Sequence, residues 1–361
     1  MAESPFRLAV VTPVFNDWSS LSILLERISA LYRPEQIQFS IAVVDDGSTD
    51  PVAPLHLAVS GQTCIQRAEI VRLVTNLGHQ RAIAVGLVRV SHWSGIDAVL
   101  VMDCDGEDRP EDILPLVDAF RANGDAIILA QRGKRSENFV FKSGYSMYKI
   151  LFRSLTGRSI SSGNFVVIPR KALMATIYTP SLWNNLAATL IRARYRVVHV
   201  PTARGKRYFG SSQMNFVSLI SHGLGSISVY VDIIFVRLLL MCAGVIAAGI
   251  LAIIGVISYK LFTNLATPGW TTTLISMFLV IMFQAGVFIL GSTLMLLGNR
   301  SSYSLVPVLD CERFIERVGV DAAWHSAQAN QVHRQECEIE ADEHGPEIPL
   351  GEPIVEGSES S

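Results

Sequence analysis

Between Phe6 and about Ala130, short hydrophobic runs alternate with longer segments that mix hydrophobic and polar positions. The runs are LAVVTPV, SIAVVDDG, AEIVRLV, DAVLVMD and DAIILAQR, each of strand length and ending in polar or turn residues. Segments such as SSLSILLERISALY and GHQRAIAVGLVRVSHW repeat hydrophobic residues every three or four positions, which is typical of amphipathic helices. The alternation predicts an α/β fold with an open, mostly parallel sheet that binds ligands at the carboxyl ends of its strands.

The next stretch, residues 131–212, is rich in Arg and Lys and contains two more strand-like runs, GNFVVIP and RVVHVP. We interpret it as the acceptor-facing half of the same domain, which would then comprise residues 1–212. Residues 213–231 are moderately hydrophobic with scattered Ser and Gly, a pattern that favours a helix lying along a membrane surface.

Two long hydrophobic runs follow, Ile233 to Ser258 and Thr273 to Gly298. Each is long enough to cross the roughly 30 Å hydrocarbon core as a helix, so residues 232–300 are predicted to form a two-helix membrane anchor. The alternative is a pair of buried core helices in a soluble protein. Basic residues flank the pair outside the connecting loop, which holds one lysine, and this places both termini in the cytoplasm. These flanking residues are Arg204, Lys206, Arg207, Arg237 and Arg300.

Composition agrees with a membrane protein. Half of the residues are hydrophobic, 17% are charged and the mean hydropathy is +0.35. The net charge of −2 gives no indication of a nucleic-acid partner. The five cysteines match no zinc spacing and indicate reduced thiols. Residues 301–361 are expected to be a cytoplasmic tail, and from about residue 336 it has nine acidic residues and no Lys or Arg, which favours disorder.

The first strand ends in TPVFND and offers no glycine-rich turn for a pyrophosphate, so the chain needs another way to hold a diphosphate. Asp103 and Asp105 follow a strand-like run, and their spacing can direct both carboxylates to one side. A site with only a small number of carboxylates is typical of Mg²⁺ or Mn²⁺ that is bound jointly by the protein and by substrate phosphates. A calcium loop starting at Asp103 is excluded by Asp108 and Leu114, which stand where it needs Gly and Glu.

A second strand-like run ends in Asp45 and Asp46, followed by Gly-Ser-Thr-Asp. The two acids can accept hydrogen bonds from the base or ribose of a nucleotide. The alternative for the neighbouring Ser48 and Asp50 is a helix cap.

Four segments, PVFND, VVDDGSTD, NLGHQRAIAVG and DCDGED, in this order and spacing resemble family 2 glycosyltransferases of the GT-A fold. With two hydrophobic spans after them, the chain is most similar to the polyprenyl-phosphate glycosyltransferases, which include dolichol-phosphate mannose synthase. The resemblance implies that a nucleotide-sugar contacts Pro13, Phe15, Asp17, Asp45, Asp46, Asn76, Gly78, Ala82 and Asp103. It implies metal ligands at Asp103, Asp105 and Glu107, with Glu107 replacing the more usual glutamine.

Downstream, Arg132, Arg135, Lys142 and Ser146 resemble the basic cluster that receives the acceptor phosphate in this group, and Arg207 resembles a residue of its segment before the membrane. Arginine and lysine suit phosphate oxygens physically, although a solvated basic loop or a lipid-headgroup patch would have the same composition. Asn164 and Gln213 depart from the family pattern. The catalytic residues would be Asp103, Asp105 and Arg132.

The expected activity is an inverting, metal-assisted transfer of a sugar from a nucleotide diphosphate-sugar to a polyprenyl phosphate, at the cytoplasmic face of a bacterial inner membrane. Membrane lipid is the expected surrounding, and the family likeness favours a homo-oligomer. Two enzyme alternatives transfer sugar to a lipid hydroxyl or to a growing polysaccharide, although the QxxRW motif of polysaccharide synthases is missing. A membrane scaffold that binds a nucleotide-sugar without turnover is an alternative of a different class.

Overall fold

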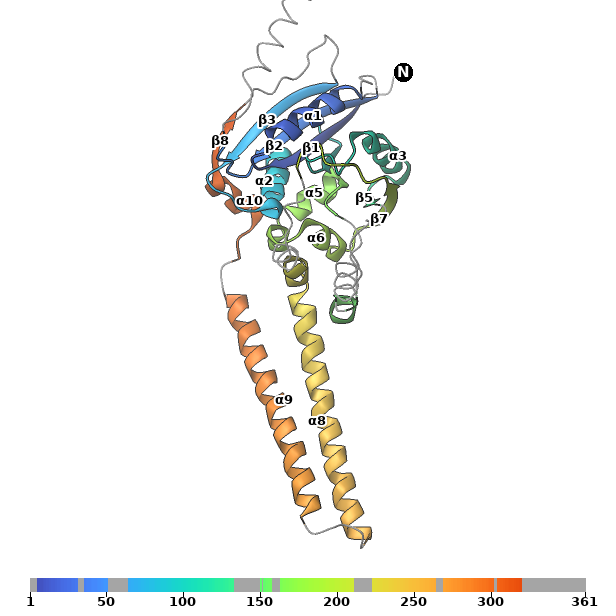
Figure 1. The fold of residues 1–361 in the computed structure, drawn as a ribbon, viewed down its shortest axis with the longest axis vertical. Coiled ribbons are helices and arrows are strands. Elements are labelled where there is room, and N and C mark those ends of the chain that lie inside the picture. Colours follow the sequence, from blue (N-terminus) through green and yellow to red (C-terminus); the bar gives the residue numbers. More distant parts are fainter. Residues whose placement is uncertain are drawn as a thin grey trace, which may run out of the picture.

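The computed structural model describes residues 5–31, 36–50, 64–132, 150, 152–157, 163–210, 223–263, 269–301 and 304–319. Its centre is an eight-stranded sheet of order β7-β5-β6-β4-β1-β2-β3-β8 (Figure 1). The strands are β1 (Phe6–Val14), β2 (Ile37–Asp45), β3 (Ile65–Leu73), β4 (Ala98–Val101), β5 (Ile127–Arg132), β6 (Val166–Pro169), β7 (Val197–Thr202) and β8 (Ile315–Gly319). Strands β6 and β8 run antiparallel to their neighbours and the other pairings are parallel, which confirms the predicted α/β class with a mostly parallel sheet.

The sheet is buried on both faces because helices cover each one. Successive side chains of a strand point to opposite faces, so Leu8 and Val10 of β1 join one core while Ala9 and Val11 join the other. Helices α1 (Trp18–Ser29) and α3 (Ile113–Asn123) cover the first face. The second face is covered by α2 (His79–Ser91), α5 (Arg170–Thr176) and α6 (Leu186–Arg192).

Helix α2 lies very close to the sheet at Gly86. A Cβ atom at this position would lie 2.5 Å from Val11 Cγ1 and 2.8 Å from Val44 Cγ2. The missing side chain therefore lets the first turn of α2 approach the carboxyl ends of β1 and β2.

Two long hydrophobic helices, α8 (Val231–Phe262) and α9 (Trp270–Ser301), run side by side away from the domain (Figure 1). Both are long and hydrophobic enough to cross a membrane. In the 18-residue hydrophobic segment of each helix, 11% of the residues of α8 and 0% of those of α9 are buried within the chain. Core helices of a soluble protein would be mostly buried, so this observation favours the membrane-anchor prediction over its alternative. Met282 of α9 packs against Gly249 of α8.

The start of α8 is attached to the α/β domain through Tyr230. Its ring is fully buried, packs edge-on against Phe152 with a centroid distance of 5.6 Å, and its hydroxyl donates to the Ala188 carbonyl at 3.1 Å. Arg192, at the end of α6, adds an ion pair of 3.1 Å to Asp232 in the first turn of α8.

After α9 the chain returns to the domain and completes its sheet. Helix α10 (Pro307–Asp310) packs beside α2, the 3₁₀ turn Cys311–Phe314 follows it, and β8 then pairs antiparallel with β3. Phe314 meets the Trp183 ring at 5.7 Å, and its carbonyl accepts a hydrogen bond from Val74 N at 3.0 Å. The sequence pattern predicted a tail here, but the structure shows that residues beyond 301 contribute the edge strand.

The predicted surface helix 213–231 is described only from residue 223, where a short helix leads to α8. The predicted acidic tail lies outside the described residues.

Candidate active site

Asp103 and Asp105 lie in a tight loop just after β4, at the carboxyl edge of the sheet. Buried Asp108 fixes this loop, because its Oδ2 accepts a hydrogen bond from Asp103 N at 3.0 Å. Asp105 Oδ1 accepts one from Glu107 N at 2.9 Å, and Gly106 between them has a φ of +90°, which favours glycine. The loop therefore holds two carboxylates in defined positions at the edge where parallel α/β sheets bind ligands.

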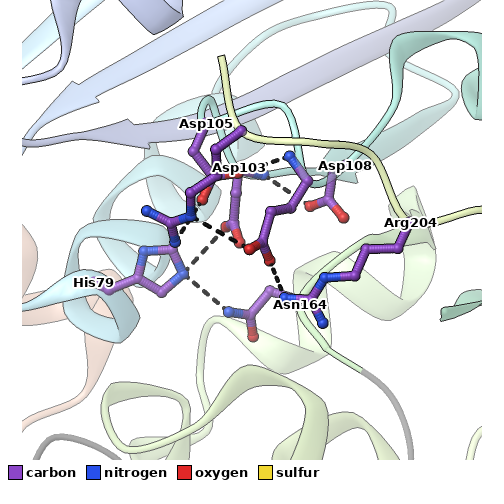
Figure 2. A network of polar contacts seen from close by, with 8 residues as sticks. His79, Asp103, Asp105, Asp108, Asn164 and Arg204 are labelled. Atoms are coloured by element: carbon purple, nitrogen blue, oxygen red, sulfur yellow. Dashed lines mark hydrogen bonds and ion pairs between the residues drawn. The ribbon is translucent and has the colours of Figure 1, made fainter. Parts of the chain in front are cut away.

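A row of hydrogen-bonded polar side chains begins at Asp103 in this loop and passes through His79 to Asn164 (Figure 2). His79, the first residue of α2, has its Nε2 3.3 Å from Asp103 Oδ1 and 3.0 Å from the Asn164 amide nitrogen. Gln80 continues the row, since its amide donates to Asn164 Oδ1 at 3.1 Å and accepts from Leu186 N at 2.9 Å. The row ties α2, the residues before β6 and α6 to the carboxylate loop.

The segment Arg204–Tyr208, which follows β7, lies against the carboxylate loop. Gly205 N donates to the Glu107 carbonyl at 3.0 Å, and Tyr208 N donates to the Asp105 carbonyl at 2.9 Å. The two backbones are so close that a Cβ at Gly205 would lie 2.0 Å from the Gly106 carbonyl oxygen. Glycine is therefore required at this contact.

Two arginines of this segment pair with the acids beneath it. Arg207 lies 2.9 Å from Asp105 Oδ2 and 3.3 Å from Glu107 Oε1, and Arg204 forms an ion pair with Glu107 Oε2 at 2.5 Å. Figure 2 shows Arg204 on the side of the site opposite Asp105. Glu107 is thus held by two cations.

Asp45 and Asp46 form the next part of the edge. Both are buried; Asp45 Oδ1 accepts from Ser48 N at 2.8 Å, and Asp46 accepts from Leu77 N at 2.7 Å and Gly78 N at 3.0 Å. Asp46 therefore fixes the turn that precedes α2.

At the end of β1, Asn16 joins the loops that follow β1 and β2. It has a φ of +51°, and its Oδ1 accepts from Thr49 N and Asp50 N at 2.9 and 3.1 Å. Asp17 accepts from Ser20 N at 3.3 Å and so caps α1, while the Phe15 side chain is exposed.

Electrostatics at the loop favour a positive ligand. Burial, followed by the nearby Asp103 carboxylate, raises the pKa of Asp105 despite Arg207. For His79, burial opposes the charged ring, but the carboxylates of Asp103, Asp46 and Asp105 together raise the imidazole pKa. A cation placed between Asp103 and Asp105 would relieve their repulsion.

The residues present fit a divalent ion that is shared with a substrate. Among the described residues, no group of three or more His, Cys, Asp and Glu side chains could hold a metal by themselves. Asp103 and Asp105 supply hard oxygen atoms, and Mg²⁺ or Mn²⁺ commonly takes its remaining ligands from phosphates and water. That Glu107 is a ligand of the divalent ion stays a prediction. Its ion pairs with Arg204 and Arg207 favour a different role for Glu107, which is to hold the Arg204–Tyr208 segment in place.

The predicted donor residues Pro13, Asp45, Asp46, Asn76 and Gly78 lie at or just after the carboxyl ends of β1, β2 and β3, near the turn that leads to α2. Ala82 is fully buried in the first part of α2. Of the predicted acceptor residues, Arg207 reaches the carboxylate loop. Arg132 ends β5, and Arg135, Lys142 and Ser146 lie outside the described residues.

Four residues of this site, His79, Gln80, Asp108 and Arg204, were not among those that the sequence pattern predicted. The position of His79 directly after Gly78, at the start of a helix that faces the carboxylates, was the available signal. The contacts of Arg204 depend on a chain reversal that no local pattern indicates.

Comparison with known proteins gives one family-model match. The model described as glycosyl transferase family 2 matches residues 9–178, which include every donor-side residue named above and the carboxylate loop. An uncharacterized glycosyltransferase of Synechocystis is 26% identical over 222 residues, or 61% of this chain and 68% of that protein.

An undecaprenyl-phosphate 4-deoxy-4-formamido-L-arabinose transferase of Salmonella enteritidis is 28% identical over 224 residues. The alignment spans 60% of this chain and 64% of that protein, slightly less than two thirds of its length. Among solved structures, glucosyl-3-phosphoglycerate synthase from Mycobacterium tuberculosis with Mn²⁺, UDP-glucose and phosphoglyceric acid is 14% identical with a TM-score of 0.44, covering 63% of this chain and 80% of that one.

Proposed function

We propose that the chain transfers a sugar from a nucleotide diphosphate-sugar to a polyprenyl phosphate. Residues 9–178 match the family model described as glycosyl transferase family 2, and the mostly parallel sheet agrees with the GT-A fold that the motifs resemble. The relatives named for transfer to undecaprenyl phosphate support this acceptor. The helix pair α8–α9 supports a lipid acceptor, since it would hold the domain at a membrane.

One observation carries the proposal. Arg207 belongs to the segment that leads towards the membrane helices, and it lies 2.9 Å from Asp105 on the donor side of the site. A lipid phosphate that approaches from the membrane would therefore meet a guanidinium next to the carboxylates that face the donor. Guanidinium groups bind phosphate oxygens strongly and with defined geometry.

The proposed reaction is a single displacement with inversion. An oxygen of the lipid phosphate forms the new bond to the anomeric carbon while the bond to the nucleoside diphosphate breaks, and the diphosphate leaves with the electron pair. The acceptor is anionic near neutral pH, so no strong base is needed. A divalent ion held by Asp103 and Asp105 would offset the charge of the leaving diphosphate.

Within the site, the chain's own residues orient the reactants. Asp45 and Asp46 lie where the nucleoside would bind, and the Asp103–Asp105 loop lies where the diphosphate would bind. We place the domain and both ends of the helix pair on the cytoplasmic face, where nucleotide-sugars are made, in agreement with the basic residues that flank the spans.

The test uses the purified full chain in detergent with Mg²⁺ or Mn²⁺, a panel of nucleotide-sugars and undecaprenyl phosphate, and detects lipid products by mass spectrometry. The expected result is a metal-dependent gain of one sugar unit on the lipid phosphate. Product on a diacylglycerol but not on undecaprenyl phosphate would contradict the acceptor. Nucleotide binding without any transfer, to either lipid, would contradict the enzyme activity and favour a scaffold.

A further inference from the structure

Strand β8, which follows the second long helix, lies at the sheet edge beside β3 (Figure 1). The register shifts between Arg72 and Leu73, which pair with Arg317 and Ile315 respectively. Glu316 is therefore the extra residue of a bulge, and bulges commonly redirect a side chain next to a functional site.

Glu316 contacts Arg72, and Arg72 connects it to the donor side of the site. Arg72 Nε lies 3.0 Å from Glu316 Oε2, and Arg72 Nη2 donates to the Ser48 carbonyl at 3.3 Å. The same Nε lies 3.8 Å from Asp45 Oδ2. Arg72 and Asp45 are register partners on neighbouring parallel strands, which places them side by side.

Asp45 has one carboxylate oxygen that the described residues leave without a hydrogen bond. The side chain is fully buried, Oδ1 accepts from Ser48 N, and Oδ2 has no hydrogen-bond partner among the described residues. The Arg72 guanidinium is near enough to offset its charge but too far for a hydrogen bond. A buried acceptor in this condition is costly unless a ligand satisfies it.

We propose that Arg72 is a positioning residue for the donor, and that β8 belongs to the donor site because Glu316 holds Arg72 in place. Arg72 supplies the counter-charge for Asp45 and leaves Asp45 Oδ2 available to an N–H or O–H group of the nucleoside. The inference rests on the proposed function, since it requires a nucleotide donor. A purely structural Arg72–Glu316 pair would only attach β8 to β3.

The experiment measures binding of UDP, GDP, dTDP and CDP with Mn²⁺ to the purified full chain by calorimetry, and continues with the tightest of them. Arg72→Ala is expected to raise its Kd about tenfold, since the Asp45 carboxylate then lacks the cation that offsets its charge beside the nucleoside. Glu316→Gln is expected to raise the Kd about threefold. Arg317→Ala and Glu312→Gln carry the same charge changes on exposed neighbours and should leave the Kd unchanged.

A charge exchange separates positioning from strand attachment. The double variant Arg72→Glu with Glu316→Arg can re-form the ion pair, so its Tm should recover relative to Arg72→Ala. Its Kd should stay raised, because a carboxylate then lies next to Asp45. Recovery of both Tm and Kd would show a purely structural pair and would overturn the inference.

The outcomes also separate this inference from the proposed function. If none of the four nucleotides binds the unaltered chain, the proposed nucleotide donor and this inference both fall. If the unaltered chain binds one of them and Glu316→Gln binds it equally well, only the inference falls. Glu316 is more than half exposed, so this variant is expected to fold even if Arg72→Ala does not.

Discussion

The carboxylates at the carboxyl edge of the sheet differ in their hydrogen-bond and ion-pair partners. Asp46 accepts two backbone hydrogen bonds, Glu107 has two arginines, and Asp105 has one backbone N–H and one arginine. Asp46 is fixed by two backbone donors and so supports the turn before α2, whereas Asp105 lies beside Asp103 in the loop after β4 and is suited to a cation. This difference leads to separate expectations for Asp105 and Asp46.

Asp105→Asn should reduce sugar transfer at least about a hundredfold, because it removes the charge that would hold a divalent ion but keeps the acceptor for Glu107 N. The Mn²⁺ affinity, measured by electron paramagnetic resonance of free Mn²⁺, should fall in parallel while the Tm is retained. The matched control is Asp118→Asn, at an exposed position of α3. Near-normal turnover in Asp105→Asn would rule out the metal role.

Asp46→Asn should lower the free energy of unfolding by about 1–3 kcal/mol at neutral pH. The amide NH₂ group replaces the oxygen that accepts from Gly78 N, so two donors face each other and that hydrogen bond is lost. Burial, more than the opposing hydrogen bonds from Leu77 and Gly78, raises the pKa of Asp46 above 3.8. Between the ordinary pKa of 3.8, which applies to the unfolded chain, and the raised pKa of the folded state, the folded protein binds more protons than the unfolded chain. The contribution of Asp46 to stability therefore falls as the pH rises through this range and is constant above it.

The variant should lack this pH dependence. Thermal unfolding from about pH 4 to about pH 7 measures it in both proteins. Parallel curves would show that the protonation of Asp46 does not contribute.

Elements fit together at two positions that substitutions can probe. At the first, Gly86→Ala should destabilise the domain by about 1–3 kcal/mol, because its Cβ overlaps with Val11 and Val44 and pushes α2 from the sheet. Thermal unfolding provides the measurement. Gly244→Ala on α8, where nothing lies within 4 Å of the added atom, serves as the control. Equal Tm changes in the two variants would contradict a tight contact at Gly86.

The second position is the docking of residues 305–319 on the domain. Burial raises the pKa values of Cys311 and Cys64 to about 11, and both thiols are buried, so neither should react with iodoacetamide near neutral pH. Phe314→Ala removes the contact with Trp183 and should accelerate alkylation of Cys311, read by peptide mass spectrometry. Cys64 is the internal control, and an unchanged Cys311 rate would show that Phe314 does not hold the segment.

Elements with a strong pattern could be predicted from the sequence, and those made by tertiary contact could not. Strands β1, β2, β4 and β5 contain aliphatic runs of strand length, and the ends of two of these runs indicated the positions of Asp45 and Asp103. Strand β8 reads IERVG, with little hydrophobic character, and forms because β3 offers a free edge. His79 and Arg204 escaped prediction for the same reason, since their partners are distant in sequence.

At the scale of the whole molecule, the domain and the helix pair are joined through Tyr230 and its neighbours. Tyr230→Ala should leave nucleotide affinity unchanged, because the described contacts of its side chain are with Phe152 and the Ala188 carbonyl. It should reduce transfer to undecaprenyl phosphate in vesicles by about tenfold to a hundredfold, because the site loses its fixed position relative to the lipid. Tyr178→Ala, at an exposed tyrosine, is the control. An equal loss of nucleotide binding would show that Tyr230 only stabilises the domain.

The late position of β8 in the chain has a consequence for biosynthesis. On the ribosome, β3 emerges long before its partner, and α8 and α9 are made between them. The nascent domain therefore has an open sheet edge, which is prone to pair with other chains, until the helix pair and β8 have been made. Synthesis of the helix pair and closure of the sheet are thus successive steps, and a chain that stalls between them leaves the edge of β3 exposed.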